Sequence, residues 1–325
     1  MRKLRNHWRI MQNCFVLFAF VFVSFALVGS SQAIGEDFYV EFSPETPGPN
    51  TSVSANLISY SFDVNRANIV WVLNGQTKLR GTGQKSFSFV TGNLGSRTDI
   101  SVSITAEDGI QLRKNFSFQV ADVDILWEAL NYTPANYKGK SLATSGSLIR
   151  ITAIPYFPES SSKLIYEWQI DYKNFPDFSG MGKNSFVFKS ADIYNKNKIG
   201  LTVSNYDRSV VAKKSVDIEI GAPKILLYEE SPLEGPKYNR ALTGGVQLEQ
   251  DEIIVRAEPY FFSIKDLEKL SYEWFMNKEK VIPEESSNIL SLRKRESSGR
   301  SLINVKISNP ANILQYADNS LGINY

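Results

Sequence analysis

Short runs of alternating apolar and polar residues dominate the chain from residue 36 onward. Alternation with a period of two predicts strands that bury one face. Turn residues such as Asn74-Gly75 and Ser179-Gly180 separate the runs, and no long stretch has the period of an amphipathic helix. The clearest runs are Ile100/Val102/Ile104, Ile199/Leu201/Val203 and Ile303/Val305/Ile307.

A strand-like run centred on a tryptophan occurs three times, at Trp71, Trp168 and Trp274. The tryptophans are 97 and then 106 residues apart, which is the period of a repeated small domain. Each shares its strand face with residues two positions away, so we expect the three indoles to point inward and form the structural core of each unit. These neighbours are Ile69 and Leu73, Tyr166 and Ile170, and Tyr272 and Met276.

Six or seven short strands in each repeat predict an all-β protein of three tandem β-sandwiches. We place the domains at residues 36–121, 122–221 and 222–325. Neither junction is long or rich in glycine and serine. We therefore expect stiffly connected modules rather than beads on a flexible tether.

Residues 1–33 differ from the rest of the chain. Four basic residues precede a 15-residue apolar run from Cys14 to Val28, and Ser31-Gln32-Ala33 supplies the small residues of a cleavage site. This pattern predicts a secretory signal peptide cleaved after Ala33. The alternative is a retained N-terminal membrane-anchor helix with its basic end in the cytoplasm. In both cases we expect the remaining chain to be exported to the cell envelope or the extracellular space.

Export changes the charge and the chemistry that the chain can offer. Without the four basic residues of the N-terminal segment, the formal charge falls from +2 to about −2, which removes the electrostatic case for nucleic-acid binding. The single His (His7) and the single Cys (Cys14) also lie in that segment. The exported part therefore lacks the residues for thiol catalysis, histidine-based triads, and zinc or haem ligation by His or Cys. We predict a non-catalytic chain without a cofactor or metal.

The motifs around the tryptophans resemble those of bacterial immunoglobulin-like repeats, including the polycystic-kidney-disease-type (PKD) domain. The second repeat matches well, with Tyr166-Glu-Trp168 followed by Leu201-Thr-Val-Ser-Asn205. The third, with Tyr272-Glu-Trp274 and Val305-Lys-Ile-Ser-Asn309, matches moderately. The sequence departs from the PKD pattern after Trp168 and Trp274, where the usual Asp/Gly-rich turn is missing. The resemblance implies the sandwich fold and a role as a spacer or adhesion unit on an exported protein.

One loop carries the residues of a candidate binding site, namely Tyr172, Phe175 and Phe178 within residues 171–182. Three aromatics on a Gly/Pro-containing loop beside a rigid strand are suited to gripping a sugar or a peptide. The competing and preferred interpretation is that the rings pack back over the edge of the sandwich.

Other candidates have weaker support. Asp122 and Asp124 at the first junction lack the spacing of a calcium loop. Asn50, Asn115 and Asn131 fit the N-glycosylation pattern, which matters only in a host that glycosylates. Paired carboxylates could support glycoside hydrolysis without His or Cys, yet no pair stands out by its spacing.

Three functions follow from these patterns. The leading one is a non-catalytic envelope protein whose modules form a stalk, adhesion or interaction element, with other envelope proteins or surface glycans as partners. It would contact the membrane only through an uncleaved N-terminal segment and bind no nucleic acid. The second is a carbohydrate- or peptide-binding module that uses the aromatic loop, and the third is an exported hydrolase that uses carboxylates.

Overall fold

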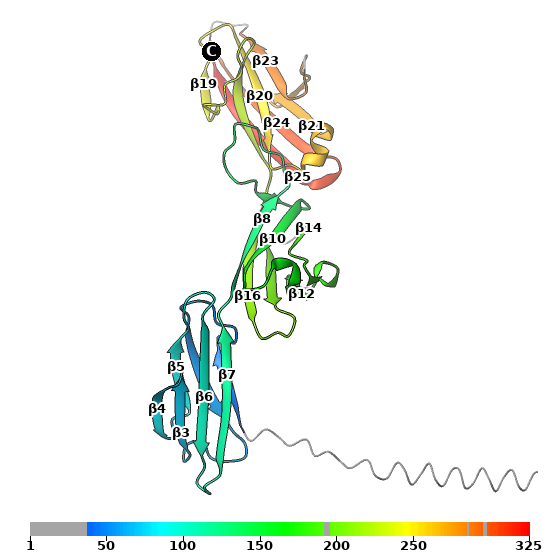
Figure 1. The fold of residues 1–325 in the computed structure, drawn as a ribbon. Helices are drawn as coiled ribbons and strands as arrows, with labels where there is room; N and C mark the ends of the chain where they lie inside the picture. Colours follow the sequence, from blue (N-terminus) through cyan, green and yellow to red (C-terminus); the bar gives the residue numbers. More distant parts are fainter. Residues whose placement is uncertain (1–37, 192–195, 285, 295–297) are drawn as a thin grey trace, which may run out of the picture.

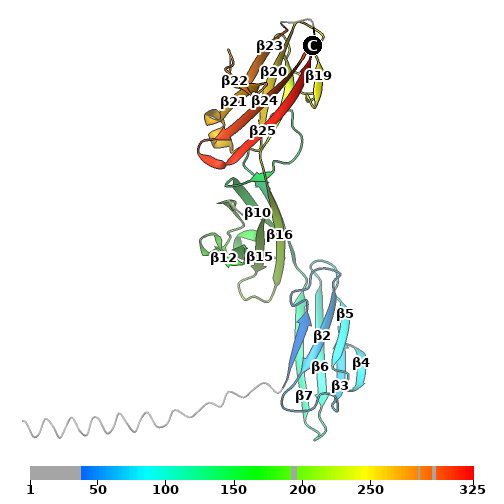
Figure 2. The same cartoon turned by 180° about the vertical axis from the view of Figure 1, so that it is seen from behind.

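The computed structural model describes residues 38–325 except 192–195, 285 and 295–297. It confirms the all-β prediction, since strands form nearly all of the regular structure of the described residues and only three short 3₁₀ helices occur among them. Three β-sandwiches follow one another in an elongated column (Figures 1 and 2). The predicted signal or anchor segment, residues 1–33, lies outside the described residues. Within the described part of the chain, no helix is long and apolar enough to cross a membrane.

The first sandwich packs a three-stranded sheet, β1-β2-β5, against a four-stranded sheet, β4-β3-β6-β7. All of its neighbouring strands are antiparallel. The strands are β1 (Tyr39–Ser43), β2 (Ser52–Ile58), β3 (Asn68–Leu73), β4 (Gln76–Thr82), β5 (Ser86–Val90), β6 (Arg97–Thr105) and β7 (Gln111–Gln119).

The second sandwich repeats this arrangement with one addition. Its sheets are β14-β10-β8 and β12-β11-β15-β16-β9, and the short strand β9 pairs in parallel with the last strand, β16. The elements are β8 (Asp122–Ala129), β9 (Ala143–Thr144), β10 (Leu148–Tyr156), η1 (Ser161–Lys163), β11 (Ile165–Ile170), β12 (Lys173–Asn174), η2 (Pro176–Phe178), β13 (Gly180–Met181), β14 (Ser185–Lys189), β15 (Lys196–Ser204) and β16 (Val211–Gly221).

The third sandwich has the same plan, with sheets β18-β17-β20-β23 and β19-β25-β24-β21-β22. Here β19 pairs in parallel with the last strand, β25. The elements are β17 (Lys224–Ser231), β18 (Gly235–Pro236), β19 (Gly245–Gln247), β20 (Glu252–Tyr260), η3 (Ile264–Lys269), β21 (Ser271–Met276), β22 (Glu279–Val281), β23 (Ile289–Arg293), β24 (Arg300–Asn309) and β25 (Asn312–Asn324).

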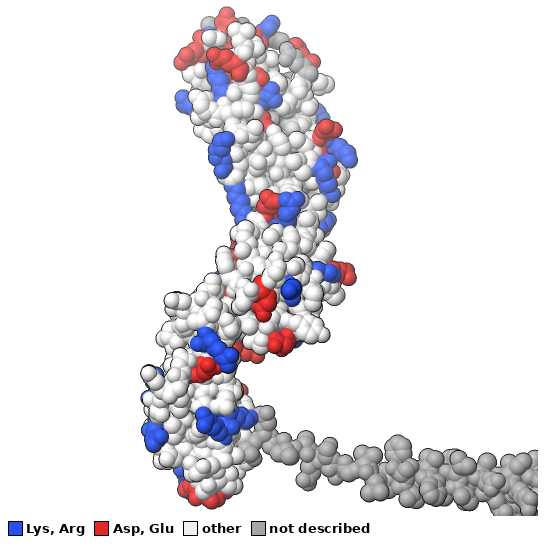
Figure 3. All heavy atoms as spheres, viewed as in Figure 1, with Lys and Arg blue, Asp and Glu red and all other residues white. Residues whose placement is uncertain are grey.

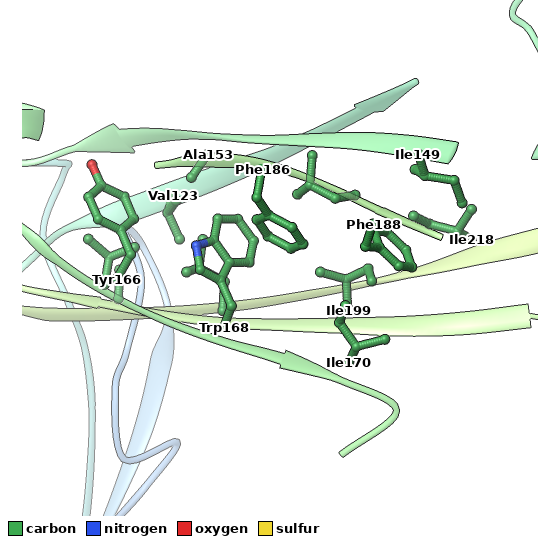
Figure 4. Close-up of a cluster of buried hydrophobic side chains, with 14 of the residues drawn as sticks. Val123, Ile149, Ala153, Tyr166, Trp168, Ile170, Phe186, Phe188, Ile199 and Ile218 are labelled. Carbon is green, nitrogen blue, oxygen red and sulfur yellow. The ribbon is translucent and has the colours of Figure 1, made fainter. Parts of the chain in front are cut away.

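Each sandwich has its own apolar core, with a tryptophan at its centre. Trp71, Trp168 and Trp274 are at most 1% exposed. Figure 4 shows Trp168 in the space between the two sheets, with Tyr166 and Phe186 beside it. Complete burial of such a ring stabilises each sandwich by a few kcal/mol. The expectation that Met276 shares this inward face was wrong, because Met276 lies at the end of β21 and its side chain is 36% exposed.

The indole N–H of each core tryptophan donates a hydrogen bond to a backbone carbonyl at an equivalent position. Trp71 Nε1 donates to the Gln84 carbonyl, Trp168 Nε1 to the Lys183 carbonyl, and Trp274 Nε1 to the Ser287 carbonyl, at 2.8–2.9 Å. In each case the acceptor lies shortly before the strand that faces the tryptophan strand from the other sheet. A buried donor without a partner is costly, so this bond orients the ring as well as stabilising it.

A two-residue turn follows the tryptophan strand in all three sandwiches, although its sequence is different each time. The turn residues are Asn74-Gly75, Asp171-Tyr172 and Asn277-Lys278, and all six have positive φ. The first residue of each turn accepts a hydrogen bond through its side-chain oxygen from a backbone N–H of the adjacent strand, at 2.8–2.9 Å. Asn and Asp suit this position because they tolerate the left-handed conformation and bond to nearby backbone.

Candidate functional site

The aromatic loop of the second sandwich splits into two parts. Phe175 and Phe178 stack with ring centroids 5.6 Å apart, and Phe178 stacks in turn on the buried Phe186 at 4.8 Å. Both rings are half-buried and pack against the core that contains Trp168. They therefore close the open edge of the sandwich, as the preferred interpretation of this loop predicted.

Tyr172 lies apart from those two rings. It occupies the second position of the turn after β11, with a φ of 65°, and its side chain is 78% exposed. Its only described partner is Lys198, whose Nζ lies 5.0 Å from the ring centroid and 3.3 Å from the hydroxyl oxygen. The structure thus brings Phe175 and Phe178 together but leaves Tyr172 outside the stack.

A hollow of about 470 Å³ lies beside the stacked rings. Its apolar side is formed by Phe175, Phe178 and Val187, and Asp171 and Asn197 supply polar groups. Those polar groups are engaged with each other, because Asn197 Nδ2 donates to Asp171 Oδ2 at 2.8 Å. The hollow can accept an apolar side chain or the face of a sugar ring, and each carboxylate oxygen of Asp171 already accepts one hydrogen bond from the protein.

The junction between the second and third sandwiches is closed by hydrogen bonds that the sequence analysis did not foresee. The loop between β8 and β9 lies against the end of β20, where Tyr132 N–H donates to the Phe262 carbonyl at 2.7 Å and Phe261 N–H donates to the Tyr132 carbonyl at 2.8 Å. The side chain of Gln315 adds bonds to the Thr144 hydroxyl and the Ser145 carbonyl, both at 3.2 Å.

Aromatic rings cover the outer side of this junction. Tyr137 of the β8–β9 loop packs edge to face on Tyr260 and on Phe261, each at 5.7 Å between centroids. Tyr228 completes the buried part of this cluster, and its hydroxyl bonds that of Tyr260 at 2.9 Å. Phe262, the next residue along the chain, belongs instead to the core of the third sandwich.

A buried carboxylate lies at the same junction. Glu258 is 5% exposed, and it accepts hydrogen bonds from the hydroxyls of Tyr132 at 2.9 Å and Tyr238 at 3.1 Å. Burial, together with the nearby Glu258 charge, raises the pKa of Tyr132 and raises that of Tyr238 to about 12. Both phenols therefore stay protonated as donors at neutral pH, and Tyr132 ties the second sandwich to a charge inside the third.

The junction between the first and second sandwiches is more open. The ion pair between Lys213 Nζ and Glu45 Oε2 joins them at 2.8 Å, and both side chains are largely exposed. A hollow of about 510 Å³ lies between the two sandwiches, with Arg208 and Glu167 on one side and Thr46 and Gln119 on the other. Exposed ion pairs contribute little to stability, and among the described residues no backbone hydrogen bond joins these two sandwiches as it does at the next junction. Basic and acidic groups are interspersed over the face shown in Figure 3.

The remaining sequence candidates lie in ordinary surroundings. Asp122 and Asp124 flank Lys214 Nζ at 4.0 and 3.9 Å, and no cluster of three metal-ligating side chains occurs among the described residues. Asn131 is buried and donates to the Leu142 carbonyl at 2.8 Å, so it is a poor glycosylation acceptor. Asn115 lies within β7, and Asn50 lies exposed in a turn.

Comparison with known proteins yields no family. No family profile matches the chain, and no curated protein is similar to it in sequence. Among solved structures, the central fibronectin-III array of RIM-binding protein covers 86% of this chain and 93% of its own, with 10% identity and a TM-score of 0.30. The fibronectin(III)-like modules of Clostridium thermocellum CbhA cover 56% and 94%, with 12% identity and a TM-score of 0.27.

A third similar structure is that of Bacteroides ovatus SGBP-B in complex with a mixed-linkage heptasaccharide. It covers 89% of this chain and 70% of its own, with 8% identity and a TM-score of 0.21. Similarity at this level carries nothing about ligands, and the fold assignment rests on the sheets described above. By its own strand order, the chain is a divergent protein of tandem immunoglobulin-like β-sandwiches.

Proposed function

We propose that this chain is an exported, non-catalytic spacer of the cell envelope, in which the second and third sandwiches act as one stiff unit. The observation that carries the proposal is their junction, where backbone hydrogen bonds run in both directions between Tyr132 and residues 261–262. The covalent links are short at both junctions, since β7 ends at Gln119 and β8 begins at Asp122, and β16 ends at Gly221 and β17 begins at Lys224, so the paired backbone is what distinguishes the second junction. A short link with paired backbone restricts rotation between the modules.

The first sandwich forms the more mobile end of the spacer. Its contact with the second sandwich includes the exposed Lys213–Glu45 pair and an open hollow. A spacer built this way holds the second and third sandwiches in line while the first sandwich moves relative to them. This arrangement suits a protein that must present a surface at a distance. Export rests on the N-terminal pattern, and the absence of His and Cys after residue 14 supports a non-catalytic role.

Small-angle X-ray scattering of the full chain in detergent, with the detergent matched out, tests the spacer. We expect curves that fit an elongated column with motion confined to residues 119–122. A Lys213→Ala variant should broaden the distance distribution slightly, while the 2–3 unit keeps its length. A compact particle, or bending at residues 221–224 in the unmodified chain, would contradict the proposal. Export is tested by the N-terminal residue of the secreted protein, which is Ile34 after cleavage.

The hollow beside Phe175 and Phe178 favours a second candidate, a carbohydrate- or peptide-binding module. A glycan and peptide array tests it. Specific binding that is lost in Phe175→Ala and kept in Tyr172→Ala would assign the ligand to this hollow, because Tyr172 lies outside the stack. Binding that is lost in neither variant would remove the aromatic loop from consideration.

A further inference from the structure

The last strand of a sandwich has an outer edge, and the second and third sandwiches cover that edge with a short parallel strand. We call β9 and β19 the capping strands. In the third sandwich, Gly322 N–H of β25 donates to the Gly244 carbonyl at 2.9 Å, and Leu248 N–H donates to the Asn324 carbonyl at 2.8 Å. In the second, β9 pairs with the end of β16 in the same direction. The capping strand thus pairs with residues 322–324 of β25 in the third sandwich and with Ile220 and Gly221 at the end of β16 in the second.

The equivalent edge of the first sandwich is open. The registers Ile100↔Phe116 and Ile303↔Leu321 make Ser117 the counterpart of Gly322 and Gln119 the counterpart of Asn324. Val120 N–H donates to the Ser96 carbonyl across the sheet. Because pairing alternates along antiparallel strands, the backbone groups of Ser117 and Gln119 point away from β6. Among the strands of the described residues, none pairs with this edge.

The missing capping strand has a cause in the sequence. The stretch between β1 and β2 that corresponds to a capping strand contains Pro44, Pro47 and Pro49. Proline has no backbone N–H and cannot supply a ladder hydrogen bond. These residues pass near the end of β7 without pairing with it.

The open edge also exposes apolar surface. Phe118 is half-buried, whereas its counterparts Ile218 and Ile323 are at most 2% exposed. A groove of about 610 Å³ lies between β1 and β7, with Phe42, Phe116 and Phe118 among its lining residues. Figure 1 shows β7 at the side of its sheet, next to no other strand of that sheet but β6. An unpaired strand beside an apolar groove is a template for strand addition.

We propose that β7 binds an extended segment of a partner protein as an added strand, parallel to β7 in the manner of β9 and β19. The segment would place apolar side chains at alternate positions over Phe116 and Phe118. The only charged residues that line the groove are Glu41 and Glu45. Because Glu45 already pairs with Lys213, the Lys or Arg at the flanks of the segment faces mainly Glu41. The surface is separate from the aromatic loop and from the 2–3 junction, but it borders the hollow between the first two sandwiches, which Ser117, Phe118 and Gln119 also line.

The probe is a fluorescent peptide with the sequence of residues 243–248, Thr-Gly-Gly-Val-Gln-Leu, between two lysines. We expect saturable binding to the full chain in detergent, measured by fluorescence anisotropy. N-methylation of the leucine removes the N–H that bonds Asn324 in the third sandwich and keeps the side chain. It should weaken binding roughly tenfold, as should Glu in place of the flanking lysines at low salt.

The protein variant is Ser117→Pro, which removes an outward N–H and leaves the bonds to β6 in place. Its matched control is Ser117→Ala, which keeps that N–H. We expect roughly tenfold weaker binding in the first, unchanged binding in the second, and the same far-UV circular dichroism in both. Absence of binding to the unmodified chain, or equal binding by the proline variant, overturns the proposal. Self-association of the chain that Ser117→Pro abolishes would also overturn it, because a second copy would then occupy β7.

Discussion

Removal of one hydroxyl group should loosen the junction between the second and third sandwiches. In Tyr132→Phe, the Glu258 carboxylate loses a hydrogen bond of 2.9 Å and keeps the bond from Tyr238. Glu258 is only 5% exposed, so water cannot freely replace the lost donor. A hydrogen bond to a buried charge is worth about 1.5–3 kcal/mol, which corresponds to a roughly 10- to 150-fold rise in the equilibrium constant for local opening.

Amide hydrogen exchange measures that opening directly. The reporters are the Tyr132 and Phe261 amides, which bond across the junction. Their exchange should accelerate by the same factor, while amides of the central strands β15 and β24 keep their rates because each sandwich has a core of its own. The matched control is Tyr172→Phe, which removes an exposed hydroxyl 3.3 Å from Lys198 Nζ.

Three results would refute this reasoning. Unchanged exchange of the two junction amides would mean that the Tyr132 hydroxyl contributes nothing to the closed junction. Equal acceleration in Tyr172→Phe would mean that the effect is not specific to Glu258. Acceleration throughout β15 and β24 would mean that the substitution destabilises whole sandwiches rather than the contact between them.

Three further predictions concern the cores and the buried phenols. Trp274→Ala should destabilise the third sandwich by about 3–5 kcal/mol, seen in urea unfolding as an earlier transition for one third of the signal, while the other two transitions stay in place. Phe178→Ala should lower the stability of the second sandwich by about 2–4 kcal/mol, because it removes the ring that stacks on Phe186. The exposed Tyr172 provides the control, and Tyr172→Ala should change the stability by less than about 0.5 kcal/mol. Equal effects would contradict the conclusion that Phe178 packs on the core while Tyr172 does not. The third sandwich should lose stability as the pH rises from about 10 to about 12, because burial raises the pKa of Tyr238 and of Tyr272 to about 12, so the folded state holds protons that the unfolded state releases near 10. Thermal melts across this range, with phenolate absorbance as the probe of ionisation, check the last of these.

The repeated turn after the tryptophan strand shows where sequence reasoning stopped short. In the first sandwich the sequence Asn74-Gly75 predicts the turn, because glycine adopts positive φ without strain. Tyr172 and Lys278 occupy the same position in the other two, and neither residue type suggests it. The surrounding strands and the Asp171 and Asn277 side-chain bonds hold the backbone in this conformation. A signal was present in the Asn or Asp at the first position, three residues after each tryptophan.

The junctions show a second limit. Asn131, Thr144 and Gln315 look like ordinary polar loop or strand residues in the sequence, yet all three are buried where two sandwiches meet. Their partners lie as far as 171 residues away along the chain. Periodicity reports which face of a strand is buried, but it carries no information about which module covers a loop.

The fold follows from local patterns. Period-two alternation, turn residues and the spacing of three tryptophans are each set by neighbours in the chain, and burial of one strand face leaves few arrangements other than stacked sheets. Those patterns were sufficient to predict three sandwiches with a tryptophan in each core.

The candidate sites depend on contacts between distant segments. Whether Phe175 faces solvent or the core, whether Glu258 finds two phenols, and whether the edge of β7 is covered are all settled by residues far apart in the sequence. The sequence shows the prolines between β1 and β2. That they leave the first sandwich without a capping strand is evident only from comparison with β9 and β19 in the other two sandwiches. Local sequence predicts the sandwiches because buried apolar residues recur with the two-residue period of a strand. The candidate sites could not be predicted in this way, because they form where loops, strand edges and neighbouring sandwiches come into contact.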